Sequence, residues 1–326
     1  KFIFKGKDKK MDYKVIQGDC LSSLKKMQDQ SVDCCITSPP YWQLRDYGVE
    51  GQLGMESTPK EFVDTLVEIF KEVKRVLKDE GTLWLNLGDS YVGGGRGQDY
   101  CKPDAVQQKY IDAGVKYCKP TGKIKGLKPK DLVGIPFRVA LALQDSGWWL
   151  RQDIIWHKPN PMPESVTDRC TKSHEYLFLL SKSQKYYYDN EAIKEEAVYQ
   201  NKKVRSPQGW DISVGQGGHG SYHKEGRSKE FKEFTQKTMR NKRSVWTIPN
   251  KRYKGSHFAT FPTKLVEPCV LAGCPEGGTV LDIFGGSGTV AEVALQHNRN
   301  AVLCELNPEY VDLIHERMKN VHPTLI

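Results

Sequence analysis

Short runs of branched apolar residues alternate with amphipathic stretches along most of this 326-residue chain. This alternation is typical of a mostly parallel sheet covered by helices on both faces, because each crossover between parallel strands needs a long, usually helical, connection. The expected strands lie at 13–17, 31–37, 81–87, 149–157, 175–181, 279–283 and 300–304. The expected helices lie at 20–28, 59–78, 131–146, 263–273, 288–297 and 308–319. The sequence therefore predicts a doubly wound α/β fold.

Two long stretches interrupt this alternation. Residues 93–129 and 191–245 lack a regular spacing of apolar residues and are rich in Gly, Lys and aromatic side chains. Connections of this length in an ordered domain are usually functional loops or inserted modules. We therefore expect one large α/β domain whose two parts, 11–190 and 246–326, are separated by an inserted module at 191–245.

Positive charge gathers in the same two stretches. The chain has a net charge of +9, while residues 191–260 carry 15 Lys and Arg against 7 Asp and Glu, and residues 93–130 carry 9 against 3. Two basic segments on an otherwise acidic scaffold suit a polyanion such as nucleic acid, although solvated surface loops can have the same composition. No apolar run approaches the roughly 20 residues that a membrane-spanning helix needs, so no membrane association is expected.

The nine cysteines follow neither a metal-binding nor a disulfide pattern. The sequence contains no Cys-x-x-Cys pair and no Cys/His cluster at zinc spacing. This spacing favours a reduced, intracellular protein without a metal ion.

A glycine-rich turn follows an apolar strand near the end of the chain. The run Val280–Thr289 indicates a strand, a Gly-Gly-Ser-Gly turn and the start of a helix. Glycine lets backbone N–H groups approach a ligand closely, because it lacks the Cβ that would block the approach. Glu305 stands at the end of the next strand, where a carboxylate can accept hydrogen bonds from both ribose hydroxyls. A nucleoside-bearing cofactor is the expected ligand, although the glycine spacing differs from the dinucleotide pattern.

A rigid diproline ends the second predicted strand. In Ser38-Pro39-Pro40-Tyr41 each proline fixes its φ at about −65° and lacks an N–H, so the neighbouring groups are held in a stiff geometry. If the Ser38 hydroxyl and the Pro39 carbonyl accept both hydrogens of an aryl amine, the nitrogen lone pair is freed from the ring and becomes nucleophilic. We expect Tyr41 to stack on the base that carries the amine. A simple strand-ending turn is the competing interpretation.

Taken in order along the chain, these motifs resemble those of the amino-methylating DNA methyltransferases, in the permuted β group whose catalytic motif precedes the cofactor motif. The similarity covers about Tyr13–Asp189 and Ser244–Val321. It implies a Rossmann-like, S-adenosylmethionine-dependent methyltransferase fold that is circularly permuted. The part 11–190 would be the catalytic half, 191–245 the insert that recognises the DNA target, and 246–326 the cofactor-binding half.

The resemblance gives a role to each motif. Gly18-Asp19 is similar to the element that contacts the cofactor adenine, and the runs Ile155–Pro163 and Ser173–Leu179 are similar to the region that closes the base pocket. Thr260–Leu265 is similar to the motif that holds the methionine end. The implied catalytic residues are Ser38, Pro39, Pro40 and Tyr41. The residues implied to bind S-adenosyl-L-methionine are Asp19, Thr260, Phe261, Pro262, Asp282, Phe284, Gly286, Gly288, Thr289, Glu305 and Asn307.

Small departures from the family pattern bear on the target base. Ile283 and Gly285 replace the Pro and Ala that often occupy the glycine loop, and both should preserve the turn. The catalytic motif begins with Ser38 rather than Asp or Asn, and within this family Ser favours N4 of cytosine over N6 of adenine. The resemblance therefore implies a site-specific enzyme that methylates N4 of a flipped cytosine in duplex DNA.

Several alternatives remain open from the sequence. An adenine-N6 methyltransferase would share every cofactor motif, and an inactive DNA-recognition subunit would share the fold, although the intact Ser38 and Tyr41 argue against it. A nucleotide-dependent oxidoreductase is disfavoured because it leaves the diproline unexplained. Pro268-Cys269 resembles the nucleophile of enzymes that methylate carbon 5 of cytosine, but it lies in a helical apolar pattern that predicts a buried structural cysteine.

The resemblance also implies partners and a location. Double-stranded DNA is the expected substrate, a cognate restriction endonuclease is a possible partner, and the oligomeric state is left open. The expected location is the cytoplasm in association with the nucleoid, or the nucleus if the source is eukaryotic.

Overall fold

The chain divides into two compact units. In the computed structural model, which describes residues 11–93, 116–117, 124, 126–197, 239–250 and 261–321, one unit comprises 1–193 with 243–326 and the other comprises 194–242. The insert expected at 191–245 begins and ends slightly outside the second unit. Most of that insert, 198–238, lies outside the described residues, as does most of the basic stretch 93–129.

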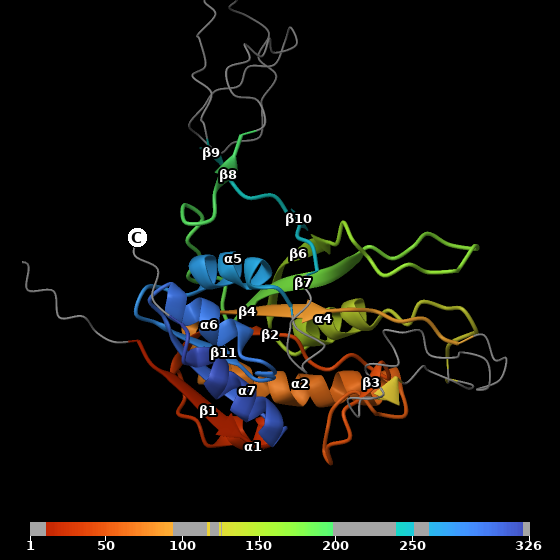
Figure 1. The fold of residues 1–326 in the computed structure, drawn as a ribbon, viewed down its shortest axis with the longest axis horizontal. Coiled ribbons are helices and arrows are strands. Elements are labelled where there is room, and N and C mark those ends of the chain that lie inside the picture. The colour runs from red at the N-terminus through yellow and green to blue at the C-terminus, as the bar shows by residue number, and fades with distance from the viewer. Residues whose placement is uncertain are drawn as a thin grey trace, which may run out of the picture. The chain divides into compact units, whose positions relative to one another are not determined.

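An eight-stranded sheet forms the centre of the first unit (Figure 1). The strands run in the order β1-β12-β11-β2-β4-β7-β6-β10, and within this sheet only β7 is antiparallel to its neighbours. The prediction of a mostly parallel sheet is confirmed. The strand bounds are β1 (Tyr13–Gln17), β2 (Val32–Thr37), β4 (Leu77–Leu87), β6 (Trp149–His157), β7 (His174–Ser181), β10 (Val245–Thr247), β11 (Thr279–Asp282) and β12 (Asn300–Glu305).

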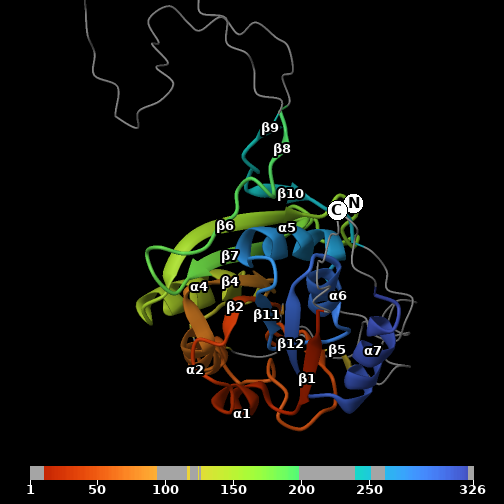
Figure 2. The same ribbon diagram turned by 90° about the vertical axis from the view of Figure 1, so that its left-hand side faces the viewer.

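Helices cover both faces of this sheet (Figure 2). One face carries α1 (Cys20–Lys25), α2 (Pro59–Val76) and α4 (Ile135–Asp145). The other carries α5 (Thr263–Gly273), α6 (Thr289–Gln296) and α7 (Pro308–Met318). Each face has its own cluster of buried apolar side chains, so the doubly wound prediction is confirmed. Among the described residues, no helix combines the length and apolar character needed to cross a membrane.

Two further pairs of short strands complete the described structure. In the first unit, β3 (Arg45–Asp46) pairs antiparallel with β5 (Lys116–Tyr117). In the second unit, β8 (Glu195–Glu196) pairs antiparallel with β9 (Met239–Arg240), and Arg240 Nε donates to Glu195 Oε1 at 3.0 Å.

Helix α2 shows how local sequence sets the boundaries of an element. The Thr58 hydroxyl oxygen accepts the Glu61 N–H at 3.2 Å, and Pro59 fits the first turn, where no N–H partner is needed. The helix was expected to reach residue 78, but it ends at Val76 and β4 begins at once with Leu77, which pairs with Val32. Residues 78–80 are exposed and charged, so the apolar pattern gave no sign of this early part of the strand.

The remaining differences from the prediction are small. Helix α1 ends at Lys25 rather than at 28, and α4 begins at Ile135 rather than at 131. Strand β10 was not predicted, because three residues are too few to show a period. It pairs parallel with β6 and therefore places Val245, expected in the insert, in the main sheet.

Candidate active site

The glycine-rich turn and the diproline motif leave neighbouring strands at the same edge of the sheet. Strand β11 lies between β12 and β2, and all three run parallel, so their carboxyl ends meet. Ligands of open α/β sheets bind at this edge. The Thr37 hydroxyl donates to Asp282 Oδ1 at 2.7 Å, and the Phe284 N–H donates to the same oxygen at 3.1 Å. The structure therefore brings the two predicted motifs together.

Asp282 is buried at the centre of this junction, with 1% of its surface exposed. Burial raises the pKa of its carboxyl to about 7, although the hydrogen bonds from Thr37 and Phe284 favour the charged form. Asp282, the last residue of β11 before the glycine turn, therefore changes its charge near neutral pH.

We expect Asp282 to make stability depend on pH. Because its folded-state pKa of about 7 lies above the ordinary 3.8, it contributes stability that is present below pH ~4 and is lost as pH rises through 7. Asp282→Asn removes this titration. The free energy of unfolding of the wild type, relative to the variant, should fall by about 1.4 kcal/mol per pH unit between these limits. Urea unfolding across this range measures it, and a pH-independent difference contradicts the assignment.

Glu305, at the end of β12, closes the glycine turn. Its Oε2 accepts the Gly286 N–H at 2.7 Å, and its Oε1 accepts the Asn307 N–H at 2.8 Å. Burial raises the pKa of this carboxyl above its ordinary value. The Gly18 N–H donates to the Glu305 backbone carbonyl at 2.8 Å, which places Gly18 and Asp19 beside the turn.

The turn is also held from helix α7. Gly286 and Gly288 have φ values of +51° and +80°, a region that glycine adopts without strain. Between and after them, the Ser287 carbonyl and the Thr289 hydroxyl oxygen accept from Arg317 Nη1 at 3.1 and 3.0 Å. The backbone of the turn is therefore held at Gly286 by Glu305 and at Ser287 by Arg317.

Two of the predicted cofactor residues also cap helices. Asp19 Oδ1 accepts the Ser22 N–H at 2.8 Å at the start of α1, and Asn307 Oδ1 accepts the Glu309 N–H at 2.9 Å at the start of α7. Each has a structural role beside any role in ligand binding.

The predicted methionine-end motif is described only in part. Phe261 lines a small cavity together with Thr37 and Asn86, which places it beside the end of β2. Pro262 is the N-cap residue of α5. Thr260 lies outside the described residues.

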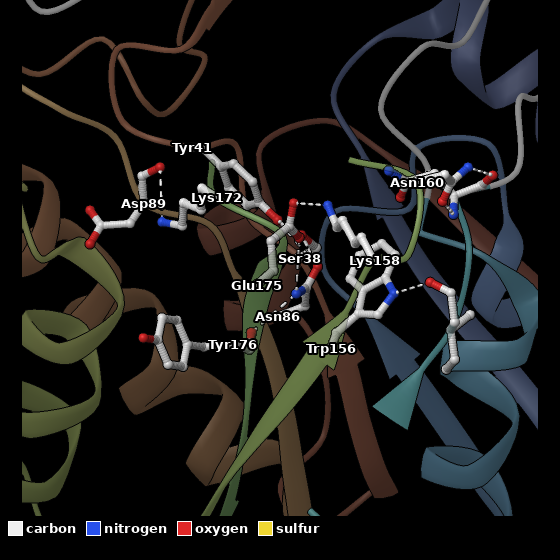
Figure 3. A network of polar contacts seen from close by, with 12 residues as sticks. Ser38, Tyr41, Asn86, Asp89, Trp156, Lys158, Asn160, Lys172, Glu175 and Tyr176 are labelled. Atoms are coloured by element: carbon white, nitrogen blue, oxygen red, sulfur yellow. Dashed lines mark hydrogen bonds and ion pairs between the residues drawn. The ribbon is translucent and has the colours of Figure 1, made fainter. Parts of the chain in front are cut away.

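A polar network surrounds the diproline motif (Figure 3). Its centre is Asn86 on β4, the strand next to β2. Asn86 Oδ1 lies 3.3 Å from Ser38 Oγ and 3.2 Å from the Tyr41 hydroxyl, which donates to Glu175 Oε2 at 2.7 Å. Burial and the nearby charge of Glu175 raise the pKa of Tyr41 well above its ordinary value. The tyrosine is therefore neutral, and its hydroxyl acts as a donor.

The two runs expected to close the base pocket meet at this network. Strands β6 and β7 pair antiparallel, and beyond their end the Lys158 N–H donates to the Ser173 carbonyl at 2.7 Å. Lys158 forms an ion pair with Glu175, and its Nζ lies 4.1 Å from the centre of the Trp156 ring. Both charged side chains are mostly buried, at 16% and 17% exposed.

A comparison with protein families shows which family this chain belongs to. The family model described as DNA methylase, for N6 and N4 methyltransferases, matches residues 32–316. The chain belongs to this DNA methylase family. The match spans both the diproline motif and the glycine turn, so the motif-based resemblance is confirmed.

Close relatives cover nearly the whole chain. Type II methyltransferase M.Cfr9I of Citrobacter freundii is 47% identical over 312 residues, which is 96% of this chain and 89% of that protein. Type II methyltransferase M.SmaI of Serratia marcescens is 45% identical over 305 residues, 94% of this chain and 90% of that protein. The chain is therefore a DNA methyltransferase of the restriction–modification type.

Solved structures share the fold. PvuII DNA methyltransferase, described as cytosine-N4-specific, has a TM-score of 0.61 at 20% identity and covers 97% of this chain and 92% of its own. A putative DNA modification methylase from Thermus thermophilus, complexed with S-adenosyl-L-methionine, has a TM-score of 0.57 at 21% identity, covering 96% of each chain. The predicted Rossmann-like methyltransferase fold is confirmed. As a member of the DNA methylase family, this methyltransferase uses S-adenosylmethionine.

The residues at the edge of the sheet fit this cofactor. Glu305 offers a buried carboxylate at hydrogen-bonding distance from the glycine turn, which suits ribose hydroxyls. Among the described residues, no group of three or more His, Cys, Asp or Glu side chains could hold a metal ion. Cys269 is buried and its thiol donates to the Leu265 carbonyl at 3.2 Å, so the prediction of a buried cysteine is confirmed.

Glu305→Ala should weaken binding of S-adenosylhomocysteine about 5- to 150-fold, because it leaves ribose hydroxyls without an acceptor, a loss of about 1–3 kcal/mol. It should also lower the free energy of unfolding by a similar amount, because the Gly286 and Asn307 N–H groups lose their acceptor. Calorimetric titration measures the first effect and urea unfolding the second. Unchanged affinity in a destabilised variant would falsify the ribose assignment while leaving the structural one intact.

Gly88, directly after β4, sets the position of the Tyr41 ring. A Cβ added at Gly88 would lie 2.4 Å from Tyr41 Cε2 and 2.8 Å from Cδ2, too close for any real contact. Gly88→Ala should therefore displace the ring and lower single-turnover methylation about tenfold or more, since a misplaced group costs reaction rate steeply. Cofactor affinity should stay at the wild-type value. A wild-type rate for this variant would show that the ring position is unimportant for the reaction.

Sequence reasoning missed four residues of this site: Asn86, Gly88, Lys158 and Glu175. Lys158 and Glu175 lie in the runs assigned to the base pocket, but their ion pair joins two strands whose register the sequence does not reveal. Asn86 left one usable signal, a polar amide inside the apolar run Leu83–Leu87. A buried amide needs partners, which points to a polar network nearby.

Proposed function

We propose that this methyltransferase transfers a methyl group to N4 of a cytosine flipped out of duplex DNA. The observation that carries the proposal is the position of Ser38: a neutral hydroxyl stands at the end of β2, beside the glycine turn, where related enzymes often have Asp or Asn. Within this family, serine at this place favours cytosine N4.

The residues of the diproline motif would act by positioning the amine. Ser38 Oγ and the Pro39 carbonyl accept its two hydrogens, which draws the nitrogen toward tetrahedral geometry and turns its lone pair out of the ring. Tyr41 stacks on the flipped base and holds it in the pocket. S-adenosylmethionine, when bound, supplies an electrophilic methyl group. The amine needs no strong base, because its proton leaves only after the new N–C bond has formed.

The second unit, 194–242, is proposed to read the DNA target. Its sequence carries the types of side chain that contact phosphates and base edges, and residues 191–260 hold an excess of basic groups. As relatives are Type II methyltransferases, we further propose a cognate restriction endonuclease as the functional partner.

Methyl transfer from tritiated S-adenosylmethionine to mixed-sequence DNA tests whether this chain catalyses the reaction by itself. We expect label to enter the DNA with the wild type and to be strongly reduced with Ser38→Ala. Absence of transfer by a folded protein that binds cofactor would favour an inactive DNA-recognition subunit instead.

A further inference from the structure

The Asn86 side chain can take only one orientation in the polar network of Figure 3. It is buried, with 3% exposed, so its nitrogen and its oxygen both need partners within the protein. The nitrogen donates to the Tyr176 backbone carbonyl at 3.1 Å and to Glu175 Oε2 at 3.3 Å. Both partners are acceptors with no hydrogen to give. The amide oxygen must therefore face Ser38 and Tyr41.

Tyr41 does not compete for that oxygen. Its hydroxyl has one hydrogen, and Glu175 Oε2 lies nearer, at 2.7 Å, than Asn86 Oδ1, at 3.2 Å. A carboxylate is also the stronger acceptor. Lys158 pairs with the other oxygen of Glu175 and holds this carboxylate in place. Tyr41 thus donates to Glu175. The Ser38 hydrogen then has two acceptors within reach, the Tyr41 hydroxyl oxygen and Asn86 Oδ1 at 3.3 Å, and the amide oxygen is the stronger acceptor of the two.

We propose that Asn86, held in place by Glu175 and Lys158, fixes the polarity of the Ser38 hydroxyl. With its hydrogen turned toward Asn86, Ser38 presents only lone pairs to the base pocket. The pocket wall then accepts hydrogen bonds and cannot donate one. The pocket wall therefore favours a base whose edge carries an amine, such as cytosine, over a base that carries a carbonyl at the same place, such as uracil. Asn86 is thus a positioning residue for specificity, an inference that rests on the proposed function.

The test compares binding to two duplexes that differ only in the target base, cytosine or uracil. Fluorescence anisotropy is recorded with S-adenosylhomocysteine present, so that no methyl transfer occurs. Asn86→Leu keeps the branched shape of the side chain but removes the acceptor, which frees Ser38 to turn its hydrogen toward uracil O4. The wild-type preference for cytosine over uracil should fall about tenfold in this variant. The uracil duplex is paired more weakly at the target base, but this difference is the same for the wild type and for Asn86→Leu. It therefore cancels when the preferences of the two proteins are compared.

Two controls separate this role from a general loss of stability. Thr82→Val removes a buried hydroxyl from the same strand. This hydroxyl donates to Cys34 or Gly273 and accepts from the Trp84 indole N–H, so the preference should stay at the wild-type value. In a Ser38→Ala background, Asn86→Leu should not change the preference further, because Asn86 acts through Ser38. Cofactor titration verifies that each variant is folded, and Asn86→Ala replaces Asn86→Leu if the larger side chain prevents folding.

An unchanged preference in folded Asn86→Leu, or an equal shift in the Ser38→Ala background, overturns the proposal. These outcomes are separable from a failure of the proposed function. If the wild-type product is N6-methyladenine, the proposed target base is wrong, and the same comparison made with adenine and hypoxanthine still tests the polarity of Ser38.

Discussion

Ser38→Ala is expected to lower the single-turnover rate of methyl transfer about 100-fold, while affinity for S-adenosylhomocysteine changes less than about twofold. The variant removes one of the two acceptors proposed to hold the amine and leaves the Pro39 carbonyl alone. An amine with one hydrogen unbound keeps more of its lone pair in the ring, so each captured base reacts more slowly. Cofactor affinity is spared because the hydrogen bond from Thr37 to Asp282 still ties the glycine turn to β2.

The measurement is single-turnover methylation of a duplex with the native site, at saturating enzyme and cofactor. Ser146→Ala is the matched control, since it removes a hydroxyl that donates to the Leu143 carbonyl at the end of α4, and it should react at the wild-type rate. A wild-type rate for Ser38→Ala would show that this hydroxyl does not hold the amine.

Replacing residues 194–242 with a short Gly/Ser linker is expected to abolish site-specific methylation, a loss of at least about 1,000-fold at the native site. The proposed reader supplies both the contacts to base edges and part of the basic charge, so its loss removes specific binding and flattens the salt dependence of the remaining binding. The catalytic motif, the glycine turn and Glu305 all lie in the other unit, so cofactor binding should persist.

The replacement must leave the main sheet intact. Ile193 and Trp246 are buried at 7% and 5% exposed and belong to the core of the first unit, so the replacement stops short of both. Calorimetric titration with S-adenosylhomocysteine verifies the fold, and mapping of methylated positions measures site selection. A linker variant that still methylates the native sequence would place the reader elsewhere in the chain.

Elements with a strong period could be predicted from the sequence, and elements fixed by tertiary pairing could not. The apolar stripe of α2 and the strand at 279–283 carry their own signal, because each buries a continuous face. The start of β4 at Leu77 carries none, because exposed charged residues follow it and its pairing with Val32 is a long-range contact. Strand β10 could not be predicted for the same reason, because it is defined by its long-range pairing with β6.

In the candidate site, too, some features could be predicted from the sequence and others could not. Ser38, Tyr41 and Glu305 could be proposed from sequence, because a diproline turn and an acid after a strand are local patterns with a clear chemical use. The contacts among these groups could not be predicted from the sequence. Asn86 and Glu175 come from strands separated by some ninety residues in sequence, and their hydrogen bond depends on the antiparallel register of β4 and β7. Chemistry could thus be assigned to motifs, whereas the orientation of each hydrogen bond required the structure.

Mass spectrometry of nucleosides from DNA methylated by the wild-type enzyme tests the central claim most directly. Duplex DNA containing the native site is methylated with deuterated S-adenosylmethionine and digested, and the labelled nucleosides are separated. The proposed function predicts label in N4-methylcytosine, and about 100-fold less of it after the same short reaction with Ser38→Ala. Label in N6-methyladenine or in 5-methylcytosine would contradict it.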